Sequence, residues 1–305
     1  MSKAKGKLTK SERTSRKEKI ISFIVLFLVS VLFAFPLIYM IGTSLKSDLD
    51  LQLHPEKIFP SHGEWTLEHY STFIVNNGKA DQLPFWMLNS LWSSFATVAL
   101  TVLVDLMVAF AVVFLQFKGK KVMMKFLILW MAIPGVIGTA PSFVMYVVAK
   151  QALNIGTGMD GYFYAYFWMI VPAITGIFNM LLMRNFFMSI PKDIIDSAKS
   201  DGASYMTIFR RIVIPLAKST IMLIILFSFV GAWNNLMWPQ LILAGEDPFW
   251  NTVTVGLTGY TGGSSWGQLG ASMAVSVFTM IPIIIIFAVT QNKMIDGLAS
   301  TGVKM

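Results

Sequence analysis

The segment SIPKDIIDSAKSDGASYMTIFRRIVIP, residues 189–215, is polar and charged, yet it lies between two long apolar stretches of the chain. A plain connection between two membrane-crossing helices needs far fewer residues. Helix-forming residues stand on both sides of Gly202, which predicts a helix, a break and a second helix. The segment therefore indicates a structured element on a membrane surface, with a membrane span on either side of it.

The composition places the whole chain in the membrane class. Hydrophobic residues make up 55% of the 305 residues and charged residues only 13%, which no ordinary soluble domain shows. Six apolar stretches reach the length of about 20 residues that a spanning helix needs. They are continuous, whereas the strands of a membrane β-barrel alternate in polarity. We expect an all-α membrane protein with six transmembrane helices near residues 20–44, 85–114, 122–149, 162–188, 216–243 and 268–290.

The basic residues predict the orientation of these spans, because cytoplasmic segments are rich in lysine and arginine. With both termini in the cytoplasm, the inner segments contain 20 of the 24 basic residues, and the outer segments contain nine of the 16 acidic ones. The net charge of +8 is then a signal of topology and not of nucleic-acid binding. The segment 189–215 becomes cytoplasmic. The inner segments are 1–19, 115–125, 184–218 and 290–305.

One membrane domain, residues 20–290, lies between a basic N-terminal segment (1–19) and a C-terminal tail (291–305). The first apolar run is too long for a signal peptide and has no cleavage site after it, so we expect a retained helix. The basic run Lys3–Lys19 is interpreted as its positive flank rather than as a lipid-binding arm. The longest outer loop, about residues 46–84, contains several prolines and glycines and should be ordered by turns.

Two features of the outer segments, three histidines and a glycine-rich run, resemble binding sites, but their residue spacing does not fit a metal site or a phosphate loop. His54, His62 and His69 are separated by eight and seven residues, which suits neither a tight metal loop nor one helical face. The chain contains no cysteine, so thiolate metal sites are excluded. The glycine-rich run 256–270 lacks the residues of a phosphate loop and is expected to be a flexible entry to the last helix. Gly263-x-x-x-Gly267 within it permits close helix packing, but a single such motif is weak.

The first half of the segment 189–215 has the signals of a short helix. Ser189 is the expected N-cap, and Pro191 suits the first turn. Asp193 and Asp196 lie where the helix dipole favours negative charge. Gly202 is expected to end the helix.

In the second half, Ser204 is the expected cap, and Pro215 should end the segment. One helical face is apolar, and it comprises Tyr205, Ile208, Phe209 and Ile212. Two interpretations remain open at this point: a docking element for another protein, or an amphipathic anchor in the membrane interface.

The run Asp196-Ser-Ala-Lys-Ser-Asp-Gly-Ala203, followed by Phe209, Ile212 and Pro215, resembles the EAA loop of binding-protein-dependent ABC importer permeases. Asp196-Ser197 stands where that family has Glu-Ala, and Lys199-Ser200 where arginine and an apolar residue are common. The resemblance covers nearly the whole chain and is to the MalG-like carbohydrate branch. Further similar positions are Pro55, Phe59-Pro60, Thr66–Tyr70, Asn89-Ser90, Pro134, Pro141, Arg184–Phe187, Ser189–Pro191, Trp233-Asn234, Trp238-Pro239 and Asp296–Lys304.

This resemblance implies a fold, a function and partners. The fold would be the MetI-like transmembrane domain of a type I ABC importer, with six spans and a cytoplasmic coupling helix. The chain would import a carbohydrate, in the first place an oligosaccharide, across the bacterial inner membrane. It has no P-loop and no cofactor site, so ATP hydrolysis would belong to a partner. The implied partners are two copies of an ATPase subunit, a second homologous permease and an extracytoplasmic sugar-binding protein.

The resemblance also assigns residues to the contact with the ATPase. Most of them would shape the coupling helix and its contacts: Asp196, Ala198, Asp201, Gly202 and Ala203. Tyr205 and Phe209 would pack the element back onto the permease. The tail Thr301–Met305 would also reach the ATPase dimer.

Polar side chains within the spans are candidates for the substrate path, because they are costly in a membrane. Amides beside aromatic rings suit sugars, and Asn234, Asn235 and Trp238 offer that combination. Hydrogen bonds between helices would explain the same residues. The remaining polar positions are Asn89, Asp105, Asn179 and Gln240.

The alternative function, a gradient-driven carrier, depends on Asp105. As a proton-relay residue it would make the chain a gradient-driven secondary carrier, whereas as a paired or neutral buried acid it would be structural. Inverted repeats and broken helices would favour the carrier. No internal repeat is evident, and we favour the importer.

Overall fold

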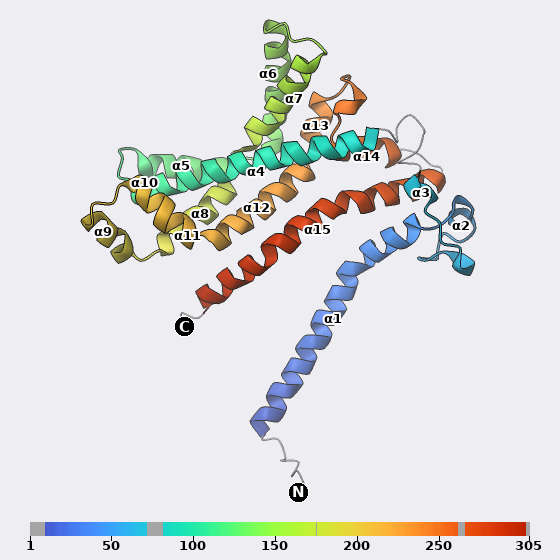
Figure 1. Cartoon of the computed structure of the whole chain (residues 1–305), viewed down its shortest axis with the longest axis horizontal. Helices are drawn as coiled ribbons and strands as arrows, with labels where there is room; N and C mark the ends of the chain where they lie inside the picture. The colour runs from blue at the N-terminus through green and yellow to red at the C-terminus, as the bar shows by residue number, and fades with distance from the viewer. Residues whose placement is uncertain (1–9, 72–81, 175, 262–265, 303–305) are drawn as a thin grey trace. The chain divides into compact units, whose positions relative to one another are not determined.

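The computed structural model describes residues 10–71, 82–174, 176–261 and 266–302. The chain forms two compact units: residues 1–72 with 263–277, and residues 73–262 with 278–305. All regular elements among the described residues are helices, as expected (Figure 1).

The first unit contains the first span and the segment that follows it. α1 (Lys10–Ser44) exposes its apolar side chains from Ile20 to Ile41, as a helix in contact with lipid or another chain does. α2 (Asp48–Leu53), the 3₁₀ turn η1 (Ser61–Gly63) and α3 (Glu68–Ser71) follow. The first turns of α15 (Trp266–Gly302) complete the unit.

The histidines of this unit are engaged in its packing. The His69 ring is buried, its Nε2 donates a hydrogen bond to Lys46 O (2.9 Å), and the ring lies directly against Gly270 of α15. His54 is 3.6 Å from Glu56. The side chain of His62 lies outside the described part. In that part, no three His, Cys, Asp or Glu side chains are grouped as metal ligands would be.

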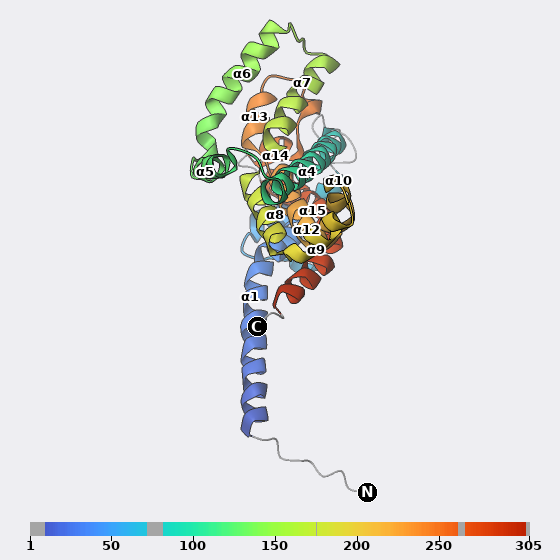
Figure 2. The ribbon, with the colours of Figure 1, turned by 90° about the vertical axis from the view of Figure 1, so that its left-hand side faces the viewer.

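The second unit is built around α4 (Leu83–Phe114). α8 (Ile177–Ser189) and α12 (Lys218–Trp233) pack along it (Figures 1 and 2). The other elements before α8 are α5 (Lys120–Met131), η3 (Gly135–Gly138), α6 (Thr139–Ala152), α7 (Met159–Ile170) and η4 (Val171–Ile174). Those after it are α9 (Lys192–Ser200), α10 (Tyr205–Ile208), η5 (Phe209–Val213), α11 (Ile214–Leu216), α13 (Met237–Ile242), η6 (Pro248–Trp250) and α14 (Val253–Thr261).

Among the described residues, four spans are single candidate helices and two more are bent helix pairs. The single ones are Lys17–Ser44, Leu83–Phe114, Lys218–Ile242 and Leu269–Met294. The bend between Met159–Ile174 and Ile177–Ser189 is 41°. Counting each bent pair as one span gives the six that we expected. Among the single ones, the helix is interrupted only briefly between α12 and α13.

A continuous helix over 122–149 was a wrong prediction, because α5 and the helices from Gly135 to Ala152 meet at 94°. Pro134 stands at the bend with an extended backbone (φ −59°, ψ 126°). A proline has no N–H to donate and pushes the residue before it out of the helical region. The apolar composition that predicted the span is insensitive to such a break.

The glycine-rich run also differs from the expected flexible loop. Residues 256–261 belong to α14 and residues 266–270 to α15, so the run is helical on both sides of residues 262–265. Gly256 lies against the indole ring of Trp86, where a Cβ would collide with the ring. That glycine therefore serves packing rather than flexibility. The motif Gly263-x-x-x-Gly267 and the tail motif around Thr301–Met305 lie outside the residues whose side chains are described.

Candidate functional site

The segment that follows α8 forms a helix, a tight turn and a second helix, as its sequence predicts. We call residues 190–216 the coupling loop. Its first helix, α9, begins after Pro191, which takes the N-cap position without a side-chain hydrogen bond. Ser189 is not the cap that we expected: it is the last residue of α8, and its Oγ donates to Phe186 O (2.7 Å). A hydroxyl that bonds a carbonyl at one helix end is not available to the next helix.

Gly202 ends α9 with a left-handed backbone (φ +79°). Its N–H donates to Lys199 O (2.9 Å), and the N–H of Ala203 donates to Ala198 O (3.0 Å). These two bonds form a Schellman motif, in which glycine is the residue that adopts positive φ at least cost. Ala198 and Ala203 are the partners that close it, and both pack on the buried core. The expectation for Gly202 as the stop is confirmed.

Ser204 caps the second helix, also as expected, since its Oγ accepts from Thr207 N (3.2 Å). The helix does not end at Pro215, however. A π-helical turn, Phe209–Val213, precedes α11, and Pro215 is among the first residues of α11. A π turn widens the helix and relieves the clash between a proline ring and the carbonyl four residues earlier. The chain therefore continues as helix from the loop into α12.

The inner face of the coupling loop is anchored on α4 and α8. Ile195, Ile208 and Val213 are all at least 97% buried in one apolar cluster with side chains of α4 and α8. The ring of Phe209 lies 4.9 Å, centroid to centroid, from that of Phe110 on α4. The expected packing of Phe209 onto the membrane domain is confirmed.

Tyr205 does not pack onto the membrane domain, contrary to our expectation. Its side chain is 46% exposed, and Lys199 Nζ lies 5.4 Å from its ring centroid. Tyr205 is the first residue after the cap, and helical side chains point back toward the N-terminus. Its ring is therefore directed over the preceding turn, where Lys199 lies.

The outer face of the coupling loop is a mixed polar and apolar surface. Asp196 and Lys199 are exposed and only 3.9 Å apart, an ion pair of little energetic weight. None of the charged side chains of α9 is buried. The exposed members of this face are Ile194, Asp196, Lys199, Asp201, Gly202, Tyr205 and Met206. The fold of the loop needs the backbone of Gly202 but not the side chains of this face, so the face is available to another protein.

The structure separates the three residues that we expected on a substrate path. The indole Nε1 of Trp238 donates to Trp168 O (2.8 Å), which is a bond between helices. Asn234 is exposed where α12 ends. Only Asn235 reaches a buried hollow, and its backbone carbonyl accepts from Thr254 Oγ1 (2.9 Å).

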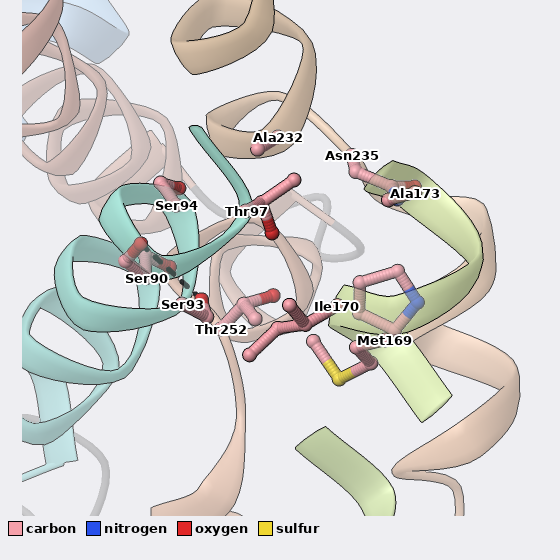
Figure 3. A pocket seen from close by; sticks show the side chains of 11 residues that line it. Ser90, Ser93, Ser94, Thr97, Met169, Ile170, Ala173, Ala232, Asn235 and Thr252 are labelled. Carbon is pink, nitrogen blue, oxygen red and sulfur yellow. Dashed lines mark hydrogen bonds between the residues drawn. The ribbon is translucent and has the colours of Figure 1, made fainter. Parts of the chain in front are cut away.

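That hollow is lined on one side by hydroxyl groups of α4 and on the other by apolar residues of α7 (Figure 3). Its volume is about 20 Å³, room for about one water molecule. A sugar ring does not fit in this conformation. The lining from α4 comprises Ser90, Ser93, Ser94 and Thr97.

Sequence reasoning missed this row of hydroxyl groups. Thr101 and Asp105 continue it along α4, and all six side chains are at least 92% buried. Thr101 Oγ1 and Asp105 Oδ2 have no hydrogen-bond partner among the described residues. The spacing of three and four residues was the available signal, because it places the hydroxyls on one helical face. No ion pair among the described residues joins Asp105 to a basic side chain, so the pairing that would make this acid structural is not observed there.

Other polar residues within the spans make structural hydrogen bonds. Asn89 Nδ2 donates to Phe249 O (2.8 Å) and Asn251 O (3.1 Å), and its Oδ1 accepts from Tyr162 OH (2.8 Å). Asn179 Nδ2 donates to Ser228 Oγ (3.0 Å), which joins α8 to α12. These residues tie the bundle together.

Comparison with known proteins agrees with this architecture. Residues 106–294 match the family of the binding-protein-dependent transport system inner membrane component. The chain is 28% identical to the arabinooligosaccharides transport system permease protein AraQ of Bacillus subtilis, covering 91% of this chain and 92% of the relative. It is 29% identical to the diacetylchitobiose uptake system permease protein DasC of Streptomyces coelicolor, covering 93% and 95%.

A further relative and a solved structure complete the comparison. The sn-glycerol-3-phosphate transport system permease protein UgpE of Salmonella typhi is 27% identical over 92% of this chain and 96% of its own. The crystal structure of a bacterial ABC transporter involved in the import of the acidic polysaccharide alginate contains a chain of the same fold. The TM-score is 0.72 at 20% identity, over 94% of this chain and 99% of that one.

The chain belongs to the family of inner membrane components of binding-protein-dependent transport systems. It is a multi-pass membrane subunit of the permease type. This membership supports the importer and not the gradient-driven carrier. Broken helices would favour a carrier on sequence grounds, but here they occur in an ABC permease fold.

Proposed function

We propose that this chain is a permease subunit of an ATP-driven importer that moves a carbohydrate into the cytoplasm. It would pair with a second homologous permease, two copies of an ATPase subunit and an extracytoplasmic sugar-binding protein. Both termini would be cytoplasmic. The observation that carries the proposal is the coupling loop, whose inner face is anchored and whose outer face is exposed.

The division of the coupling loop into two faces suits a lever between an ATPase and the membrane helices. Capping and backbone hydrogen bonds fix its shape, so docking need not deform it. Asp196, Asp201, Tyr205 and the exposed Ile194 and Met206 would contact the ATPase. Ala198, Gly202 and Ala203 would shape the turn that presents them.

Aromatic contacts join the loop to the spans that would have to move. Behind Phe209, the rings of Phe110 and Phe114 on α4 lie 5.0 Å apart. The ring of Phe114 lies 6.0 Å from that of Phe187 on α8. Close-packed interiors transmit displacement because they have few voids to absorb it. A movement of the loop would therefore reach α4 and α8 first.

The substrate class follows from the relatives. The relatives are named for the transport of arabinooligosaccharides, sn-glycerol-3-phosphate and diacetylchitobiose, which share hydroxyl groups. A hydroxyl-lined face on α4 with Asn235 beside it is compatible with such molecules. Because the hollow is too small in this conformation, any contact with a sugar would require another arrangement of the helices or the second permease.

The proposal is tested by purifying the chain from its native membrane in a mild detergent and identifying the co-purifying proteins by mass spectrometry. The expected result is an ATPase that contains a P-loop together with a second permease. Recovery of the chain alone, under conditions that keep known complexes intact, would contradict the proposal.

A further inference from the structure

The turn between α4 and α5, at the proposed cytoplasmic end of α4, is rich in basic residues and lies outside the coupling loop. The turn between α4 and α5 carries Lys118, Lys120, Lys121 and Lys125 within eight residues. The chain has no acidic residue between Asp105 and Asp160. No ion pair joins these four lysines to any residue in the described part of the chain. The turn is therefore a concentration of positive charge without a counter-charge.

One of these lysines holds the turn in place. Lys120 Nζ donates to Leu115 O (3.2 Å) and to Val113 O (3.4 Å) at the end of α4. Gly119 precedes it with a left-handed backbone (φ +87°), which lets α5 fold back at once. Lys118, Lys121 and Lys125 remain exposed. The turn is thus a fixed support that presents three unpaired ammonium groups.

A hollow and an apolar stripe adjoin these groups. The hollow has a volume of about 400 Å³ and is lined by Gln116, Phe117, Gly119, Lys120, Lys121 and Val122. Val122, Phe126, Leu129 and Ile133 follow at intervals of three to four residues, and their exposed fractions are 71%, 61%, 68% and 48%. Val122, Phe126 and Leu129 lie on one face of α5, which contains no buried residue, and Ile133 follows two residues after the end of that helix. Helix α5 starts at the end of α4 that carries the coupling loop (Figure 1).

The length of the stripe matches one leaflet of a bilayer. Twelve helical residues extend about 18 Å, and half of a hydrocarbon core is about 15 Å. A ligand that fits has a negative head of moderate size and a long apolar tail. Clusters of lysine beside a span attract anionic lipids of the cytoplasmic leaflet.

We propose that the α4–α5 turn binds the headgroup of an anionic phospholipid of the inner leaflet, with an acyl chain along the exposed stripe of α5. This site rests on the cytoplasmic orientation in the proposed function, but it is separate from the coupling loop. Lys118, Lys121 and Lys125 bind the phosphate, and Lys120 fixes the turn that presents them. A contact of this surface with the second permease or an ATPase subunit is the alternative that the test distinguishes.

The test uses the purified full complex in lipid nanodiscs of phosphatidylglycerol and phosphatidylcholine, released and analysed by native mass spectrometry. The variant combines Lys118→Gln, Lys121→Gln and Lys125→Gln. The matched control combines Lys17→Gln, Lys19→Gln and Lys293→Gln, three exposed lysines beside other spans. Each lysine near a membrane surface favours anionic lipid about fivefold. We expect the variant to lose retained phosphatidylglycerol by on the order of a hundredfold, while the control keeps it.

Three results would overturn the lipid site. Equal retention by the variant and the wild type would remove the role of the lysines. Equal loss in the variant and the control would show a general field of basic flanks and no site. Loss of the second permease or of the ATPase from the variant would show that the surface is a protein interface. Failure of the proposed function is distinguishable, because it would appear as a wild-type chain without its protein partners.

Discussion

The coupling loop and the segment after α1 are both polar, but they use their charged side chains in opposite ways. In the coupling loop the charges of α9 are exposed, and backbone caps hold the fold. In residues 45–71, which the proposed orientation places outside and which we call the outer segment, a charged side chain is the centre of the fold. The Lys46 side chain is 1% exposed.

The buried side chain of Lys46 joins separate parts of the outer segment. Its Nζ donates to His54 O (2.6 Å) and Lys57 O (3.1 Å) and lies 3.6 Å from Asp50 Oδ2. Asp50 Oδ2 also accepts from Ser61 N (3.2 Å). A buried charge of this kind is tolerated because its hydrogen bonds are made within the protein. The comparison shows that the coupling loop keeps its charges on its surface, as its proposed docking role requires, whereas the outer segment uses a charge within its own core.

The coupling loop should be the more sensitive of the two in function. Gly202→Asp places a charge on the exposed face, where nothing lies within 4 Å of an added Cβ. The strain of a left-handed residue is only about 1–2 kcal/mol, so the subunit should still insert. We expect sugar uptake and its coupled ATPase activity to fall more than tenfold, measured in membrane vesicles.

The matched control for this change is Gly245→Asp. Gly245 has the same kind of backbone (φ +80°) and the same open surroundings, but it lies outside the coupling loop. The control should retain uptake. Normal uptake by the Gly202 variant would remove the docking role of this turn.

The outer segment should be the more sensitive of the two in stability. Lys46→Met leaves Asp50 buried without its cation and two carbonyls without a donor. Breaking a buried ion pair from one side costs about 3–5 kcal/mol. Hydrogen exchange of residues 45–61 should accelerate accordingly. Lys57→Met is the control, because that side chain is exposed, and it should change exchange little.

Phe209→Ala and Tyr205→Ala separate the two faces of the coupling loop. Phe209 contacts Phe110 and packs on the core, so its removal should destabilise the subunit by about 2–3 kcal/mol in thermal unfolding. Removal of the exposed Tyr205 should change stability by less than about 0.5 kcal/mol while it weakens ATPase binding in a pull-down. The reverse ranking in unfolding would mean that the faces are assigned wrongly.

Ser204→Ala tests whether backbone caps hold the loop. The loss of its bond to Thr207 N should destabilise α10 by about 1 kcal/mol, seen as faster hydrogen exchange of residues 205–208. Ser200→Ala is the comparison, since Ser200 Oγ bonds only Asp196 O on an exposed face. Equal exchange in both variants would show that the cap contributes nothing.

Acid should affect the outer segment through Asp50. Burial raises the pKa of Asp50, but the hydrogen bonds from Ser61 and the charges of Lys46 and His54 outweigh it, so the pKa lies below its ordinary value. A carboxylate with a lowered pKa stabilises the fold fully above the unfolded pKa of about 3.9, and that contribution is lost as the pH falls through the folded pKa. The protection of residues 45–61, meaning the intrinsic exchange rate divided by the observed rate at the same pH, should therefore fall at acidic pH. In Asp50→Asn this dependence should flatten.

Much of the candidate site was readable from the sequence because its determinants are local. The stop at Gly202 and the cap at Ser204 depend on a few neighbouring residues, and both predictions are confirmed. The cap at Ser189, the end at Pro215 and the packing of Tyr205 were wrong. Each depended on which partner competed for a hydroxyl, on a π turn or on the direction of one side chain, and none of these is a property of composition.

The sequence alone determined the membrane class, the number of apolar stretches and the helix–glycine–helix form of the coupling loop. Hydropathy and backbone preference act over a few residues, so they can be read along the chain. Only the tertiary structure decided the bend at Pro134, the burial of Lys46 and the row of hydroxyls that faces the interior along α4. Composition does not record where one proline breaks a helix or which polar groups become buried. Burial then decides whether a polar group destabilises the fold, makes a hydrogen bond or lines a cavity.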